Sequence, residues 1–288
     1  MSMAALIPVV LQASIVLSVF GLGLNASSQH ATYLFRRRSQ LVRSLLSMYV
    51  VVPLFAVALV AAFALHPGVK IALVALAVSP VPPVLPRKAL KAGGEEAYTI
   101  GLLVATALLA IVFIPLAMEV LESVFAVPLQ MSAAALARLI LITVLAPLAA
   151  GMIVRHLAPA LAQQIAYPVA LLATALLVAG GLPIVFTAWP AVVSLIGNGT
   201  LAAIAVFVLV GLAAGHLLGG PNPQDRTVLA LSTASRHPGV ALAIAGANFP
   251  EQKLVLAAVL LYLIVNAIVA LPYLAWLRNQ HAGIAGTS

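Results

Sequence analysis

The sequence predicts an all-α membrane protein with about nine transmembrane helices. Its composition is 64% hydrophobic and only 7% charged, whereas about a quarter of the residues in a soluble domain are charged. Its mean hydropathy is +1.19, and apolar runs of bilayer length recur between short polar connections. So few charges cannot cover a water-facing surface on a chain of 288 residues, so we expect lipid to surround most of it.

The predicted spans follow one another along the whole chain. They cover about residues 4–24, 42–65, 69–91, 97–118, 132–155, 164–186, 199–219, 227–248 and 253–277. The third and eighth are the least regular, because Pro80, Pro82, Pro83 and Pro86 interrupt the third, and Pro238, followed by Gly239, interrupts the eighth. Proline removes a backbone donor and clashes with the carbonyl one turn earlier, so we expect both spans to be broken helices.

The basic residues predict the orientation. With the N-terminus outside and the C-terminus in the cytoplasm, the outer segments carry only Lys70 and Lys253. The cytoplasmic segments carry Arg36, Arg37, Arg38, Arg43, Arg87, Lys88, Lys91, Arg155, Arg226 and Arg278. This is the positive-inside distribution, and we expect a bacterial inner membrane. We therefore interpret the net charge of +8 as a topology signal and expect no nucleic-acid partner. The sequence does not determine the oligomeric state.

Signatures of an enzyme or a metal site are missing. The chain has no cysteine, which removes thiolate ligands and cysteine nucleophiles. It also lacks paired carboxylates inside a span, the H-E-x-x-H pattern and the G-x-S-x-G pattern. We therefore expect neither catalysis nor a bound metal or cofactor.

The two interrupted spans resemble each other. The third reads "SPVPPVLPRKALKAG" from Ser79 to Gly93, and the eighth reads "STASRHPGVALAIAG" from Ser232 to Gly246. Broken helices of opposite direction, one in each half, indicate inverted repeats with a binding site near the bilayer midplane. The alternative is a pair of ordinary proline kinks. On the first interpretation, residues 1–288 form one transporter unit with repeats at about 4–118 and 132–277 and a cytoplasmic tail at 278–288.

Nearly the whole chain resembles the bile acid:sodium symporter family in its nine-helix form. The stretch "VFGLGLNASSQHATYLFRRRSQLVRSLLSMYVVVPLFA" is similar to that family's first conserved helix, cytoplasmic loop and following helix. The resemblance implies a panel domain and a core domain, two crossing helices within the core domain, and an organic anion bound between the domains.

The chain departs from the family pattern where sodium would bind, so it resembles a divergent member. The family motif in the eighth span resembles E-x-G-x-Q-N-x-G-x-A, and Ser232 and Arg236 stand at its Glu and Gln. The other crossing helix has "PVPPVL" in place of G-G-T-A-S-N, and Met48 stands at a further glutamine. The resemblance therefore implies that the sodium ligands are lost, and sodium is a doubtful cofactor.

Arg236 and His237 are the leading candidates for the site. A guanidinium has five donors and no acceptor, and it costs at least about 2.5–3.5 kcal/mol at the bilayer centre. Arg236 could replace the charge of sodium and hold a substrate carboxylate, helped by a half-helix, or it could donate to carbonyls of the broken third helix. His237 could carry a coupling proton, or it could be a buried neutral histidine. Ser79, Ser232 and Asn266 complete the predicted substrate site.

These features predict a secondary transporter that moves a small organic anion by alternating access, independent of sodium or linked to protons. Two alternatives remain open. One is a sodium-dependent symporter with rearranged ligands, and the other is a receptor or scaffold that keeps the fold without transport.

Overall fold

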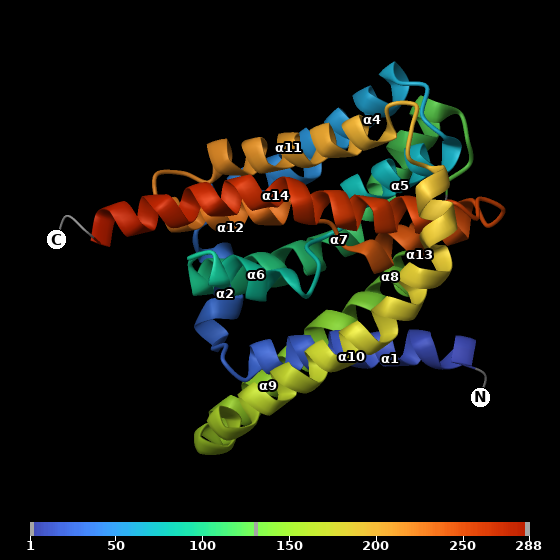
Figure 1. Ribbon diagram of the computed structural model, residues 1–288. Helices are drawn as coiled ribbons and strands as arrows, with labels where there is room; N and C mark the ends of the chain where they lie inside the picture. Colours follow the sequence, from blue (N-terminus) through green and yellow to red (C-terminus); the bar gives the residue numbers. More distant parts are fainter. Residues whose placement is uncertain (1–2, 130–131, 286–288) are drawn as a thin grey trace.

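The computed structural model describes residues 3–129 and 132–285, and every regular element in these residues is helical (Figure 1). Two elements, η1 (Leu46–Val51) and η2 (Leu141–Leu145), are π-helical segments within longer helical stretches. In chain order the α-helices are α1 (Met3–Gly23), α2 (Ser28–Arg36), α3 (Arg38–Leu45), α4 (Val52–Ala62), α5 (Pro67–Val78), α6 (Leu85–Lys91), α7 (Glu96–Phe125), α8 (Ala133–Ile140), α9 (Ala146–Leu157), α10 (Pro159–Ser194), α11 (Thr200–Leu218), α12 (Pro223–Ala234), α13 (Pro238–Asn248) and α14 (Val255–Ala285).

Within the described residues, seven helical stretches are long and apolar enough to cross a membrane. This number identifies a polytopic membrane protein. The two remaining predicted spans are each divided into two short helices: residues 69–91 correspond to α5 and α6, and residues 227–248 to α12 and α13.

The division of the third span follows from its prolines. Ser79 ends α5 with ψ 151°, the extended conformation that a residue before proline adopts. Pro80, Pro82 and Pro83 have no backbone N–H and cannot continue a helix. Pro86 has a different role, because it lies in the first turn of α6, where a missing N–H costs nothing.

The division of the eighth span depends on Pro238. Its ring cannot coexist with a helical bond to the carbonyl of Ala234, and α12 ends at that residue. Ser235 and His237 are extended, with ψ of 126° and 104°. Pro238 then begins α13, and Nδ1 of His237 caps this helix by accepting from the N–H of Val240 at 3.3 Å.

The helices form two layers (Figure 1). In the lower layer of this view, α1 packs against α9 and α10. In the upper layer, α11 packs against α12 and α14, and α5 packs against α4, α13 and α14. The lower layer is closely packed where Gly23 of α1 meets Gly151 of α9, because a Cβ on Gly151 would lie 2.8 Å from the Cα of Gly23. Small residues permit this approach of two membrane helices.

The predicted cytoplasmic tail over 278–288 overlaps the end of the last helix, because α14 continues to Ala285. The last three residues of that predicted tail, 286–288, lie outside the described residues.

Candidate functional site

The breaks in the two divided spans lie against each other. The backbone N–H of His237 donates to the carbonyl oxygen of Pro80 at 3.0 Å. Both groups lack helical partners, because they lie between half-helices. At the crossing, these non-helical backbone groups therefore find hydrogen-bond partners inside the protein, as the bilayer requires.

Arg236 is the largest fully buried side chain at this crossing, with 0% of its surface exposed. Its Nη1 donates to the carbonyl of Ser79 at 3.1 Å and its Nη2 to the carbonyl of Met48 at 2.7 Å. Ser79 is the C-cap of α5, so the guanidinium lies at the negative end of that half-helix. Its Nε is buried and has no hydrogen-bond partner among the described residues.

Tyr262 of α14 supports the backbone around the arginine. Its hydroxyl accepts from the backbone N–H of Arg236 at 2.9 Å and donates to the carbonyl of Ala234 at 2.7 Å. The second bond satisfies the carbonyl that Pro238 leaves without a helical donor. One phenol thus pairs two backbone groups at the break.

A cavity of about 420 Å³ lies between the two layers at the crossing. Ile15 of α1 and Leu177 of α10 line it from the lower layer. On the opposite side the polar lining residues are Lys88, Ser235, Arg236, His237 and Asn266. Apolar walls with a few convergent polar groups are typical of small-molecule sites.

Asn266 places an unused acceptor at this cavity. Its Nδ2 donates to Oγ of Ser235 at 3.2 Å. Its Oδ1 is buried and lacks a partner among the residues that the structure describes. Together with Nε of Arg236, it leaves one unpaired donor and one unpaired acceptor beside the cavity, and both atoms are buried in this conformation.

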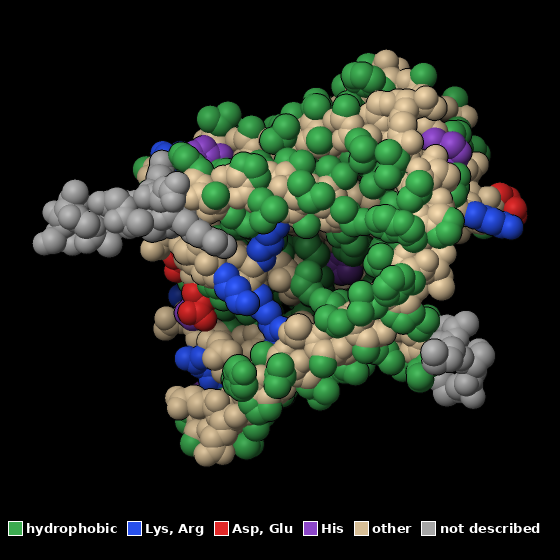
Figure 2. All heavy atoms as spheres, viewed as in Figure 1, with side chains coloured by type: hydrophobic (Ala, Val, Ile, Leu, Met, Phe, Trp, Pro, Cys, Tyr) green, Lys and Arg blue, Asp and Glu red, His purple; other side chains and the backbone are tan. Residues whose placement is uncertain are grey.

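A second cavity, of about 370 Å³, adjoins the first and shares Val84, Lys88 and Leu177 with it. Its lining adds Arg87 and Lys91. Figure 2 shows the molecule hollowed between the layers, with lysine and arginine side chains gathered along one rim. These charges favour the approach of an anion.

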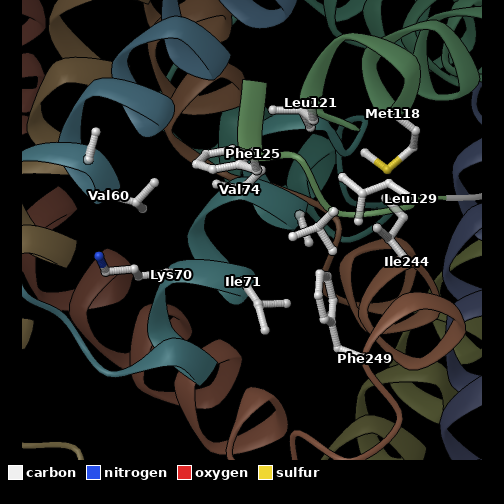
Figure 3. A pocket seen from close by; sticks show the side chains of 13 residues that line it. Val60, Lys70, Ile71, Val74, Met118, Leu121, Phe125, Leu129, Ile244 and Phe249 are labelled. Carbon is white, nitrogen blue, oxygen red and sulfur yellow. The ribbon is translucent and has the colours of Figure 1, made fainter. Parts of the chain in front are cut away.

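A third cavity lies elsewhere and has a different character. It has a volume of about 380 Å³, and its lining is apolar apart from Lys70 (Figure 3). Phe125 and Phe249 border it from α7 and from the segment after α13. Because it lacks convergent polar groups, we place the candidate site at the crossing instead.

The structure brings together only part of the predicted site. Arg236, His237 and Asn266 line the crossing cavity, and so do Pro82, Pro83, Pro238 and Gly239 among the predicted helix breaks. Ser79 and Ser232 are buried but do not line it. The hydroxyl of Ser79 donates to the carbonyl of Ala75 at 2.7 Å, so Ser79 contributes its own carbonyl to the site. Pro80 contributes its carbonyl oxygen, and Pro86 stabilises the start of α6.

Sequence reasoning missed Ser235, Tyr262 and Lys88. The sequence marks Lys88 only as a topology signal, and Tyr262 is one aromatic residue in a long apolar run. An overlooked signal is the tetrapeptide His-Pro-Gly-Val, which occurs at 66–69 and again at 237–240. Both copies begin a helix that the histidine side chain caps.

Comparison with known protein families identifies the family of the chain. A sequence model described as the sodium bile acid symporter family matches residues 13–194, which is more than half of the 288 residues. The match ends before α12 and α13. No curated protein matches the chain.

Proposed function

Because the chain belongs to the sodium bile acid symporter family, we propose that it is a secondary transporter of a small organic anion. Members of this family are transporters rather than enzymes. The layer of α1, α9 and α10 corresponds to the panel domain that the resemblance implies, and the layer with the crossing corresponds to the core domain. Movement of one layer against the other gives alternating access.

One observation carries the ion part of the proposal: Arg236 donates to two backbone carbonyls at the helix breaks. Carbonyl oxygens at broken helices are the groups that hold a coupling cation in transporters of this kind. The guanidinium donates to such oxygens, and its positive charge is covalently attached to the protein, so it cannot dissociate as a sodium ion does. We therefore propose that transport is independent of sodium.

The cavity supports a small anion as the substrate. About 420 Å³ is near the lower end of the range for ligand sites, so a compact carboxylate or sulfonate fits better than a large amphiphile. Nε of Arg236 has no hydrogen-bond partner among the described residues but is fully buried in this conformation. A conformational change that exposes it would let it bind one oxygen of the anion. Lys88 and the rim of Arg87 and Lys91 would attract it from the cytoplasmic side of the predicted orientation.

The test is uptake by the purified protein in proteoliposomes. A panel of small carboxylates and sulfonates is first screened by thermal shift, and the stabilising compounds are then supplied in radiolabelled form with or without an inward sodium gradient. We expect uptake at equal rates in the two conditions. Arg236→Gln should reduce it at least tenfold, whereas Lys253→Gln, at an exposed position, should not change it.

Two results would overturn parts of the proposal. Strong stimulation by the sodium gradient would contradict the assignment of Arg236 as a fixed cation. If a compound binds to the protein but no flux of that compound is detected, the result would favour the receptor alternative.

A further inference from the structure

A buried carboxyl–amide pair joins α12 to α3, at the end of α12 away from the cavity. Nε2 of Gln40 in α3 donates to Oδ2 of Asp225, in the first turn of α12, at 2.6 Å. Asp225 is 5% exposed. The two remaining oxygens, Oε1 of Gln40 and Oδ1 of Asp225, are both buried and have no hydrogen-bond partner within residues 3–129 and 132–285.

This pattern is unfavourable for an ionised carboxylate. A carboxylate has only acceptors, and so does the amide oxygen. Leaving a buried acceptor without a donor costs about 1–3 kcal/mol, and more when the group is charged. A protonated carboxyl has one O–H donor. It can pair with a carboxamide through two bonds at once, N–H to one carboxyl oxygen and O–H to the amide oxygen.

We propose that Asp225 is a proton-binding site, and that in this conformation its carboxylic acid donates to Oε1 of Gln40 while it accepts from Nε2 of the same residue. A single proton then satisfies both unpaired oxygens. The inference concerns this chain's own ionisation, so it does not require the transport function. Only its role as a coupling proton rests on the proposed function.

The charged groups around Asp225 come from several elements. Glu95, the N-cap of α7, disfavours the ionised carboxyl, and Arg37, between α2 and α3, favours it. Tyr33 and Tyr98 also interact electrostatically with Asp225. Neither charge forms a hydrogen bond with the carboxyl among the described residues. Burial has the largest influence on its pKa, Glu95 the next and the Gln40 bond the smallest.

Arg43 of α3 lies beside Gly220, close to the start of α12. Several other basic and histidine side chains near α12 have partners or sites of their own. Arg226 donates from Nε to the carbonyl of Gly220 at 2.5 Å. His216 of α11 contacts the hydroxyl of Tyr273 at 3.0 Å. The lysines of α6, Lys88 and Lys91, line the cavity between the layers.

The electrostatic surroundings agree with a bound proton. Asp225 lies outside the seven candidate spans. Burial raises the pKa of its carboxyl, and Glu95 raises it further, whereas Arg37 and the bond from Gln40 lower it. The net direction is upward.

The site belongs to a set of contacts that fasten α12 to α3 and η1. Further along these helices, Oγ of Ser47 and Oγ1 of Thr233 are 2.9 Å apart. At the cavity end, Arg236 donates to the carbonyl of Met48. A proton on Asp225 therefore holds the far end of the same half-helix that carries the substrate site. Loss of the proton weakens this end and leaves the arginine contact in place.

Infrared difference spectroscopy of the full-length protein in detergent tests the inference directly. We expect a carbonyl stretch of a protonated carboxyl at neutral pH, and its loss in Asp225→Asn. The asparagine supplies an N–H to Oε1 and an oxygen to Nε2, so it imitates the protonated acid and should fold. Glu251→Gln, at an exposed carboxyl, is the matched control and should keep the band.

Thermal unfolding gives a second readout. A carboxyl whose folded pKa is raised binds more protons when folded, so its stability contribution is complete below the unfolded value of 3.8 and is lost as the pH rises through the folded pKa. We expect the wild-type Tm to fall relative to that of Asp225→Asn as the pH is raised from the unfolded value of 3.8 through the folded pKa.

Parallel Tm profiles, absence of the infrared band, or failure of Asp225→Asn to fold would each overturn the inference. Neither measurement needs a substrate, so either can fail or succeed independently of transport.

If transport is found, an Asp225→Asn variant that exchanges substrate but no longer responds to a proton gradient supports coupling. Unchanged proton dependence rejects the coupling role.

Discussion

The guanidinium of Arg236 and the carbonyl of Ser79 are hydrogen-bonded across the point where the two broken helices cross. The relationship explains how the bilayer tolerates both features. The proline-rich break frees carbonyls that must not face lipid, and a buried arginine needs acceptors. The arginine supplies donors to the freed carbonyls, and the carbonyls supply acceptors to the arginine. Neither the helix break nor the buried charge would therefore be stable alone within the bilayer.

Removal of Arg236 should therefore destabilise the fold as well as the site. Arg236→Met leaves the carbonyls of Ser79 and Met48 without their donor, at about 1–3 kcal/mol each if water does not enter. Arg236→Lys keeps the charge and can reach one carbonyl, so its loss should be smaller. Thermal unfolding in detergent measures both, and equal Tm values for wild type and Arg236→Met would contradict the role of these bonds.

The hydroxyl of Tyr262 should contribute to stability through the backbone alone. Tyr262→Phe removes the partner of the N–H of Arg236 and of the carbonyl of Ala234. We expect a loss of about 1–3 kcal/mol, with the ring packing against Phe207 retained. Tyr167→Phe, at a side chain that is 76% exposed, is the matched control. A similar Tm for the two variants would show that water replaces the phenol.

The helical class, the two broken spans and much of the cavity lining were predictable from the sequence. Proline acts locally, because its ring fixes the backbone whatever surrounds it. The breaks at Pro80 and Pro238 therefore follow from the sequence alone. Arg236 and His237 were found because a polar residue within an apolar run must face protein or a cavity.

The partners in the site were not predictable in the same way. Ser79 and Met48 contribute carbonyl oxygens, and every residue has one, so no side chain marks them. Ser79 was selected for its hydroxyl, but a serine in a helix can bond the carbonyl four residues earlier, as it does here. Tyr262 meets the break only through the packing of α14, which no local pattern specifies.

His237 should be replaceable by a residue that caps a helix without titrating. Its Nδ1 accepts from the N–H of Val240, and an asparagine oxygen can do the same. We expect His237→Asn to keep near wild-type stability, and His237→Ala to lose about 1 kcal/mol. Substrate binding by His237→Asn should retain its pH dependence. Loss of that dependence would assign the coupling proton to the histidine.

The crossing helices should be sensitive to added bulk on the face of α11. A Cβ on Gly215 would lie 2.5 Å from the Cα of Ala230 and still closer to the carbonyl of Leu229. Gly215→Ala should therefore push α12 away and lower the Tm by several degrees, because backbone cannot yield as a side chain can. Gly181→Ala meets nothing within 4 Å and should stabilise α10 by up to about 1 kcal/mol. Equal effects would mean that α11 and α12 are loosely packed.

The predicted orientation can be tested with single cysteines, because the chain contains none. Gln224→Cys lies at the exposed start of α12, and Lys253→Cys lies in the exposed connection between α13 and α14. With the N-terminus outside, a membrane-impermeant maleimide added to intact cells should label residue 253 and not residue 224. Permeabilised cells should show both labels, and the unmodified chain should show neither. The reverse pattern would place the basic rim of Arg87 and Lys91 on the outer face, and the direction proposed for anion entry would then be wrong.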